Sequence, residues 1–333
     1  MTITRRMFGT VAAAAAATAL TLSSCGAPTG AGGEKLEDIS FGYINDYNGA
    51  SLLAIAKDQG YWEDHGLNVK TSVFTNGPLQ IQAMGAGDLD FGYIGPGAMW
   101  LPASGAAKLA AINTLGNADR VIAQPGINSL EDLKGKKIGI PEGTSGDMIL
   151  TLALKKAGMT KADVQAIPMD PATIVSAFAS GQIDGAGIWY PLLGNIKKQV
   201  PELTELAKNS DFSEEVAFPT AFVAGNEVVE KREESVVKVL AALRDAMKFR
   251  TENPDKTIEL TAALLAVDAE QVKADAANVN ILSVEEIDKL TEDGSINGWF
   301  NGLNDYFIEA GKLKTPVDPS TYYLGKLFVD AGK

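Results

Sequence analysis

The sequence has very little of the chemistry that most enzymes use. It contains one cysteine, Cys25, and one histidine, His65. A single cysteine cannot form an intramolecular disulfide, and these two residues cannot build a Cys/His zinc cluster. A catalytic cysteine–histidine pair would have to join two residues far apart in the chain. Most nucleophilic and metal-dependent mechanisms are therefore excluded by the residue inventory.

Positive charge is also scarce. Lys and Arg total 29 against 42 Asp and Glu, so the formal net charge is −13. This acidic balance argues against binding to nucleic acid, whose phosphate backbone attracts basic surfaces. The hydrophobic fraction of 46% and the charged fraction of 21% are typical of a globular protein with a real core. The length of 333 residues, at roughly 100 to 200 residues per domain, predicts about two domains.

Long hydrophobic runs are missing as well, because no stretch reaches the roughly 18 apolar residues of a membrane-spanning helix. The longest run, residues 11–22, follows Arg5 and Arg6 and is typical of a signal peptide. The next residues, Leu22-Ser23-Ser24-Cys25-Gly26, resemble the lipobox of bacterial lipoproteins. We therefore expect a signal peptide over residues 1–24, lipid attachment at Cys25, and a flexible tether over residues 25–37. The paired arginines also resemble a twin-arginine export signal.

Beyond residue 38 the sequence alternates between strand and helix patterns. Strands are expected at residues 39–44, 68–74, 89–94 and 109–113, and in a second series at 138–140, 164–167 and 183–188. Helices are expected between them, and only helices after residue 226. Such alternation predicts mostly parallel sheets covered by helices on both faces.

The two series resemble each other. Residues 82–95 and 176–189 align with Ala83, Gly87 and Asp90 matched by Ala177, Gly181 and Asp184, and residues 41–44 align with 138–141. The repetition predicts two related lobes. Lobe 1 is expected over residues 38–123 and 222–333, and lobe 2 over residues 124–221. The two crossovers, near Ala123 and Ala221, would form a hinge.

Several motifs occur in an order that resembles one protein family. They are Gly60-Tyr61-Trp62 with Gly66-Leu67, Gly85-x-Gly87-Asp88-Leu89-Asp90, Asp132-Leu133-Lys134-Gly135-Lys136, and Gly181-x-Ile183-Asp184-Gly185 running into Trp189-Tyr190-Pro191. The chain resembles the solute-binding proteins of bacterial ABC importers, in the group that binds alkanesulfonates, taurine, nitrate and thiamine precursors. This resemblance implies a two-lobed α/β fold of the periplasmic-binding-protein type II class that closes over its ligand. It also implies an extracytoplasmic monomer without a cofactor, whose partners are a permease and its ATPase.

The candidate ligand site lies in the loops that follow the strands, since open α/β sheets bind ligands at the carboxyl ends of strands. Glycines combined with hydroxyl or amide side chains at helix starts suit a small oxyanion such as a sulfonate. No Lys or Arg lies in these loops, and Arg120 is the nearest candidate cation. The candidate ligand-binding residues are Asn45, Tyr47, Asn48, Asn76, Gly77, Gly95, Pro96, Thr144, Ser145, Gly146, Trp189, Tyr190 and Thr220.

Aromatic residues in the same loops leave a second chemistry open. Trp189 and the tyrosines could stack on a pyrimidine-type thiamine precursor or surround a quaternary amine, with Asp46 or Asp147 supplying negative charge. Core packing is expected for Tyr43 and Trp100. A pyrimidine-forming enzyme with this fold uses its own histidine. We expect His65 to lie at a helix end away from the cleft, so the sequence favours binding without catalysis.

Overall fold

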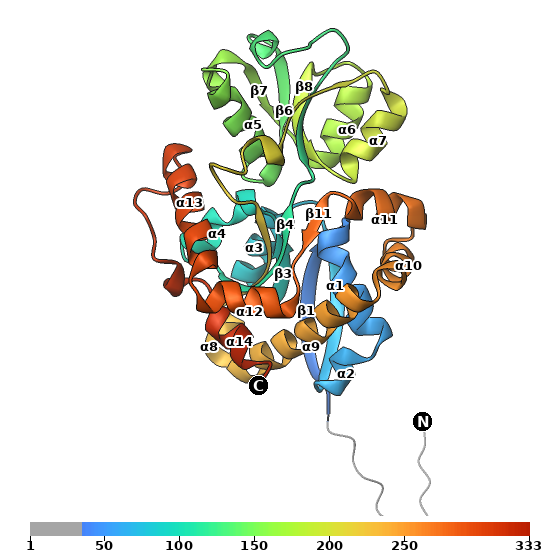
Figure 1. Cartoon of the computed structure of the whole chain (residues 1–333), viewed down its shortest axis with the longest axis vertical. Coiled ribbons are helices and arrows are strands. Elements are labelled where there is room, and N and C mark those ends of the chain that lie inside the picture. Colours follow the sequence, from blue (N-terminus) through green and yellow to red (C-terminus); the bar gives the residue numbers. More distant parts are fainter. Residues whose placement is uncertain (1–34) are drawn as a thin grey trace, which may run out of the picture. The chain divides into compact units, whose positions relative to one another are not determined.

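Two β-sheets flanked by helices make up the described part of the protein (Figure 1). The structure is a computed structural model that describes residues 35–333. The predicted signal peptide, the lipid attachment at Cys25 and most of the tether lie outside the described residues. Within residues 35–333, no helix combines the length and the hydrophobicity needed to cross a bilayer.

Sheet A has six strands in the order β11-β4-β10-β3-β1-β2. They are β1 (Glu37–Ile44), β2 (Leu67–Phe74), β3 (Phe91–Ile94), β4 (Lys108–Gly116), β10 (Pro219–Ala224) and β11 (Val279–Ile281). Strand β1 runs parallel to β2 and β3, whereas β10 is antiparallel to β3 and β4. We refer to sheet A and its helices as lobe 1.

Sheet B has five strands in the order β7-β6-β8-β5-β9, and with its helices it forms lobe 2. They are β5 (Asp119–Ala123), β6 (Lys137–Ile140), β7 (Gln165–Pro168), β8 (Gly185–Trp189) and β9 (Thr204–Lys208). Strand β6 runs parallel to β7 and β8, and β5 is antiparallel to β8 and β9. Both sheets are therefore mixed, and the prediction of mostly parallel sheets was wrong. Each sheet receives strands from chain segments that return in the opposite direction.

The repeat in the sequence corresponds to a repeat in the fold. The order β2-β1-β3-β10-β4 in sheet A matches β7-β6-β8-β5-β9 in sheet B, with the same parallel and antiparallel pairs. The aspartates matched in sequence make equivalent bonds: Asp90 accepts from Ser40 N at 2.9 Å, and Asp184 accepts from Lys137 N at 2.8 Å. Each carboxylate ties the residue just before one strand to the neighbouring strand of the same sheet.

The chain passes between the sheets at other points than the sequence indicated. It leaves sheet A after Gly116 and enters sheet B at Asp119, before the crossover expected near Ala123. It returns to sheet A at Pro219, so Ala221 lies inside β10. Strands β5 and β10 are short and fully buried. The local sequence of such a strand does not indicate which sheet it joins.

The helices of lobe 1 include nearly all of the C-terminal third (Figure 1). The C-terminal region was expected to be helical only, but β11 pairs with β4 in it. Lobe 1 contains α1 (Tyr47–Asp58), α2 (Tyr61–Asp64), α3 (Gly77–Ala86), α4 (Trp100–Ala103), α8 (Asn226–Lys231), α9 (Glu233–Glu252), α10 (Pro254–Leu265), α11 (Ala269–Ala276), α12 (Val284–Glu292), α13 (Ser295–Glu309) and α14 (Gly325–Asp330). Lobe 2 contains α5 (Ser145–Lys156), α6 (Pro171–Ala179) and α7 (Leu192–Gln199).

Candidate functional site

A cleft lies where loops from both lobes meet at the ends of the strands. The space not filled by protein atoms there is about 530 Å³, which includes open solvent at its mouth. Its lining consists of Ile44, Asp46, Asn48, Asn76, Gly77, Tyr93, Gly95, Pro96, Ala98, Gly116, Ala118, Asp119, Thr144, Ser145, Trp189, Tyr190 and Thr220. Most of the candidate residues from the sequence are among them, brought together from six segments of the chain.

Three candidate residues lie outside this lining. Asn45 borders a neighbouring hollow beside α11. Tyr47 is buried and packs with Ala262 and Val272 behind the first turn of α1. Gly146 faces the rear of lobe 2, where an added Cβ would lie 2.7 Å from Gly187 O. The sequence located the loops, but it could not tell which side of each helical turn faces the cleft.

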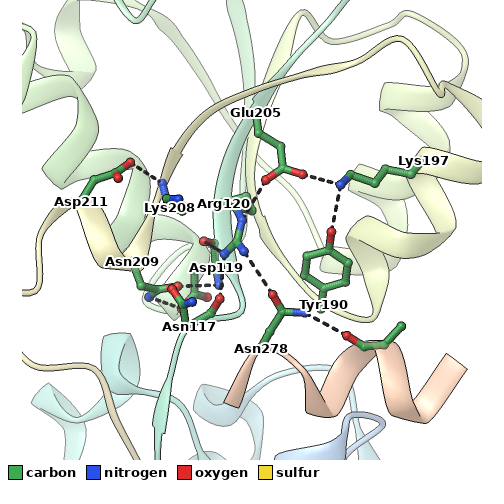
Figure 2. Close-up of polar contacts among 11 residues, drawn as sticks. Asn117, Asp119, Arg120, Tyr190, Lys197, Glu205, Lys208, Asn209, Asp211 and Asn278 are labelled. Carbon is green, nitrogen blue, oxygen red and sulfur yellow. Dashed lines mark hydrogen bonds and ion pairs between the residues drawn. The ribbon is translucent and has the colours of Figure 1, made fainter. Parts of the chain in front are cut away.

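Two carboxylates, on Asp46 and Asp119, belong to the lining; the sequence had suggested Asp46 only as the charge partner of an amine, and had not pointed to Asp119. Asp46 is the N-cap of α1, and its Oδ1 accepts from Gly49 N at 2.6 Å. Asp119 begins β5, and its Oδ2 accepts from Asn209 Nδ2 at 2.8 Å (Figure 2). The Asn209 side chain accepts from Asp119 N at 2.7 Å in return, which fixes the Asp119 backbone. A carboxylate at a helix cap is readable from sequence, whereas the position of Asp119 depends on β5 pairing in sheet B.

Burial shifts the pKa values of these acids upward. Desolvation raises the pKa of Asp119, although nearby hydroxyl and amide groups of Ser145 and Asn209 oppose the shift. Desolvation, followed by repulsion from the Asp275 carboxylate, raises the pKa of Asp46 well above its usual range. Asp275, which accepts from Tyr47 N at 2.7 Å, has its pKa raised by burial to about 7. The acids in and behind the cleft are therefore held in an environment that resists their ionisation.

The nearest cation, Arg120, does not line the cleft, and its guanidinium lies over the ring of the lining residue Tyr190, 5.7 Å from the ring centroid (Figure 2). Its Nε donates to Glu205 at 2.9 Å, and its Nη1 donates to the carbonyls of Asn117 and Asp119 at 2.7 and 2.8 Å. Its Nη2 reaches Asn278 of lobe 1 at 3.1 Å. Arg120 therefore ties the crossover segment to both lobes, and no Lys or Arg lines the cleft among the residues that the structure describes.

Several polar groups predicted to hold a ligand are occupied by the protein itself. The Thr144 hydroxyl donates to Pro141 O at 2.6 Å, and Asn76 Oδ1 caps α3 by accepting from Leu79 N at 3.0 Å. Asn48 Oδ1 accepts from the Thr114 hydroxyl at 2.8 Å, which leaves the Asn48 amide NH2 as the donor of that side chain. Because the Thr144 hydroxyl does not cap α5, the first N–H groups of α5 stay available beside Ser145.

The lobes touch directly at the cleft. Gly97, in the 3-10 turn η1 (Pro96–Ala98), approaches Thr144 so closely that an added Cβ would lie 2.1 Å from Thr144 O. This contact requires a residue without a Cβ on the lobe 1 side. Gly97 therefore lets the two loop sets meet over the cleft.

Four residues weighed in the sequence lie elsewhere. Tyr43 is buried in the main core, as expected, while Trp100 is only partly buried at the edge of that core. Asp147 is buried outside the lining, where it accepts from Gly143 N and forms an ion pair with Lys161. His65 follows α2 and lies 2.8 Å from Asp245 of α9, away from the cleft. Within residues 35–333, no group of His, Cys, Asp and Glu is arranged to hold a metal ion.

A fold of two such lobes around a cleft at the strand ends defines the periplasmic-binding-protein class. The chain belongs to the NMT1/THI5-like family, whose model matches residues 50–257. The resemblance to solute-binding proteins found in the sequence is confirmed.

Relatives extend over most of the chain. A Brucella abortus protein named only as a binding protein is 58% identical over 87% of this chain and 91% of its own length. The taurine-binding periplasmic protein of Escherichia coli is 25% identical over 82% of this chain and 87% of its own length. The alkanesulfonate-binding protein SsuA of Xanthomonas axonopodis, solved with bound MOPS, shares the fold with a TM-score of 0.66. That structure is 21% identical and covers 87% of this chain and 98% of its own.

Proposed function

We propose that this chain is the extracytoplasmic solute-binding component of an ABC importer and that its solute binds in the cleft between the lobes. The family and the relatives named as periplasmic and sulfonate-binding proteins support the role. Closure of the lobes over a small solute would create the surface that a permease distinguishes from the empty form. Lipid attachment at Cys25, export through the signal peptide and a monomeric state remain predictions from the sequence.

The proposed class of solute, a small anion, rests on one observation. The start of α5 lies at the cleft lining, and the side chain of its N-cap residue makes no capping hydrogen bond. Free N–H groups at a helix start attract anions, and those of α5 lie beside Ser145 of the lining. This end of the cleft suits the sulfonate group of an alkanesulfonate or of taurine. A full positive charge is not required for such binding.

The aromatic lining supports a second candidate. Tyr93, Trp189 and Tyr190 lie in the lining, and Tyr190 is held by Lys197, whose Nζ donates to the tyrosine oxygen at 2.9 Å. Flat rings of this kind stack on heterocycles or on amines. A pyrimidine of the thiamine-precursor type is therefore the alternative solute.

The arrangement favours binding over catalysis. The described residues place no histidine in the cleft lining, and His65 is engaged with Asp245 at the far side of lobe 1. The carboxylates that line the cleft could move a proton, but no nucleophile lies in the lining beside them except Ser145 and threonine hydroxyls. We therefore propose a transport role without turnover.

A thermal-shift screen tests the proposal. The protein without its signal peptide would be heated with taurine, alkanesulfonates, nitrate, aminopyrimidines and quaternary amines. A solute at about 100 times its Kd adds about 2.7 kcal/mol to the free energy of unfolding. The hit should also change the fluorescence of Trp189, and this change should be lost in Trp189→Phe. Stabilisation without any response from Trp189 would place the binding site outside the cleft and contradict the proposal.

A further inference from the structure

Two acidic side chains face the cleft from opposite lobes. Asp46 follows β1 of sheet A, and Asp119 opens β5 of sheet B. Both line the cleft, and they are only 5% and 4% exposed. No Lys or Arg of residues 35–333 lies in the lining, and Arg120, which attracts the Asp119 carboxylate, does so from outside it.

Asp119 leaves one carboxylate oxygen without a partner. Asn209 bonds Oδ2, but Oδ1 is buried and makes no hydrogen bond within the described residues. An unpaired buried acceptor costs about 1 to 3 kcal/mol, and more when it is charged. Such an oxygen in a cleft lining marks the place where a bound molecule would present an N–H donor.

The cations near Asp119 are committed elsewhere. The Arg120 guanidinium donates to Glu205, to two backbone carbonyls and to Asn278. Lys197 forms an ion pair with Glu205 and donates to the Tyr190 oxygen. The Ser145 hydroxyl lies near Asp119 and favours its ionised form, but it brings no charge. A positive charge in the cleft between Asp46 and Asp119 would therefore have to come from the solute.

Closure of the lobes over a solute would bring the two acids into one space shielded from water. Like charges from opposite lobes repel each other there, and burial of each carboxylate without a partner costs free energy. A cationic group placed between them removes both costs at once. A neutral or purely anionic solute would leave both costs in place.

We propose that the solute carries an ammonium or amino nitrogen, which lies between Asp46 of lobe 1 and Asp119 of lobe 2 and donates to Asp119 Oδ1. This inference rests on the proposed function and narrows it. The start of α5 receives the anionic or polar end of the solute, and the two acids select the nitrogen. Simple alkanesulfonates, which lack the nitrogen, are rejected.

The test uses pairs of compounds that differ only in the nitrogen. Calorimetric titration would compare taurine with ethanesulfonate and 4-aminopyrimidine with pyrimidine, on wild type and on Asp119→Asn. We expect the amino compound of at least one pair to bind the wild type at least about tenfold more tightly, as truncation of a buried charged contact usually costs this much. In Asp119→Asn the preference should fall to about twofold or less. Asp64→Asn, which removes an exposed charge of lobe 1, should leave it unchanged.

The possible results test the inference and the proposed function separately. Equal binding of amino and amino-free compounds, or a preference that survives Asp119→Asn, overturns the inference while leaving the importer role intact. If none of the four compounds binds, methylammonium chloride is compared with sodium chloride at equal ionic strength by thermal shift. Stabilisation by methylammonium that Asp119→Asn abolishes upholds the carboxylate site and counts against the proposed solutes. No difference between the two salts overturns the inference.

Discussion

Asp119 and Asp147 are equally buried acids of lobe 2, each 4% exposed, but the protein treats them differently. Asp147 lies in the first turn of α5 outside the cleft lining, where it accepts from Gly143 N at 3.0 Å and pairs with Lys161. Asp119 lies in the lining, and its Oδ1 has no partner within the described residues. The comparison teaches that a structural carboxylate is neutralised by the chain, whereas the one in the cleft is left for a solute.

Asp275, behind the cleft, is a third case, because a proton can take the place of a cation. Its pKa is raised to about 7 from 3.8, so the native state binds this proton more tightly than the unfolded chain. The resulting stabilisation is complete below about pH 4 and is lost as the pH rises through 7. The groups facing Asp275 are the Asp46 carboxylate, Tyr47 and the buried Arg250 guanidinium beyond it.

The largest effect is therefore expected for Asp275→Asn. In wild type the free energy of unfolding should fall between pH 4 and pH 7, by at most about 1.4 kcal/mol per pH unit from this one group. The variant should lose less over that interval, because asparagine can still accept from Tyr47 N but does not titrate. Urea unfolding at pH 4.5, 6 and 7.5 measures the slope, with the exposed Asp268→Asn as control. Equal slopes in wild type and Asp275→Asn would show that protonation of Asp275 does not stabilise the folded protein.

Removal of Lys161, the partner of Asp147, tests the difference between Asp147 and Asp119 directly. Lys161→Met leaves a buried carboxylate without its cation, and loss of one partner of a buried pair usually costs about 3 to 5 kcal/mol. Because Lys161 is itself 39% exposed, solvent screens the pair and we expect a loss of about 2 kcal/mol in urea unfolding. Asp119→Asn in the same assay should be neutral or stabilising, since it removes an unpaired buried charge. The same loss in both variants would erase the distinction between the two acids.

Gly97→Ala tests whether the burial of Asp119 depends on contact between the lobes. The added Cβ would fall 2.1 Å from Thr144 O, so the loops must separate. We expect at least about a tenfold loss in solute affinity, which corresponds to about 1.4 kcal/mol, with little change in the stability of either lobe. A larger radius of gyration in solution scattering with solute present would accompany the loss. Gly298→Ala, where α13 offers open space, is the control and should bind normally.

The sequence predicted the repeated βα pattern and most of the cleft lining because both depend on local signals. Strand periodicity and turn residues placed Asn48, Asn76 and Ser145 at strand ends, and the matched Asp90 and Asp184 marked the two lobes. Asp119 could not be found in this way. It reaches the cleft because β5 pairs with β8 and β9 after the crossover, and this pairing is a long-range choice.

Local sequence patterns also could not predict which of several possible partners a side chain would contact. Thr144 was expected to bind a ligand, but its hydroxyl donates to Pro141 O. Tyr47 was expected in the cleft, yet its ring fills the gap between α1 and the helices α10 and α11. Each outcome depends on neighbours that are distant in the sequence, which periodicity does not report.

His65→Ala gives the smallest expected effect. It adds to the comparison Asp245, a partly exposed acid that does not need a partner. His65 and Asp245 form a pair whose side chains are 28% and 40% exposed, so water can solvate either one alone. The variant should lose at most about 0.5 kcal/mol in unfolding and should bind its solute as wild type does, because surface pairs contribute little. Product analysis after prolonged incubation with an aminopyrimidine checks for turnover in both proteins. Turnover by wild type that disappears in His65→Ala would restore the enzyme alternative and would require the cleft to be placed elsewhere.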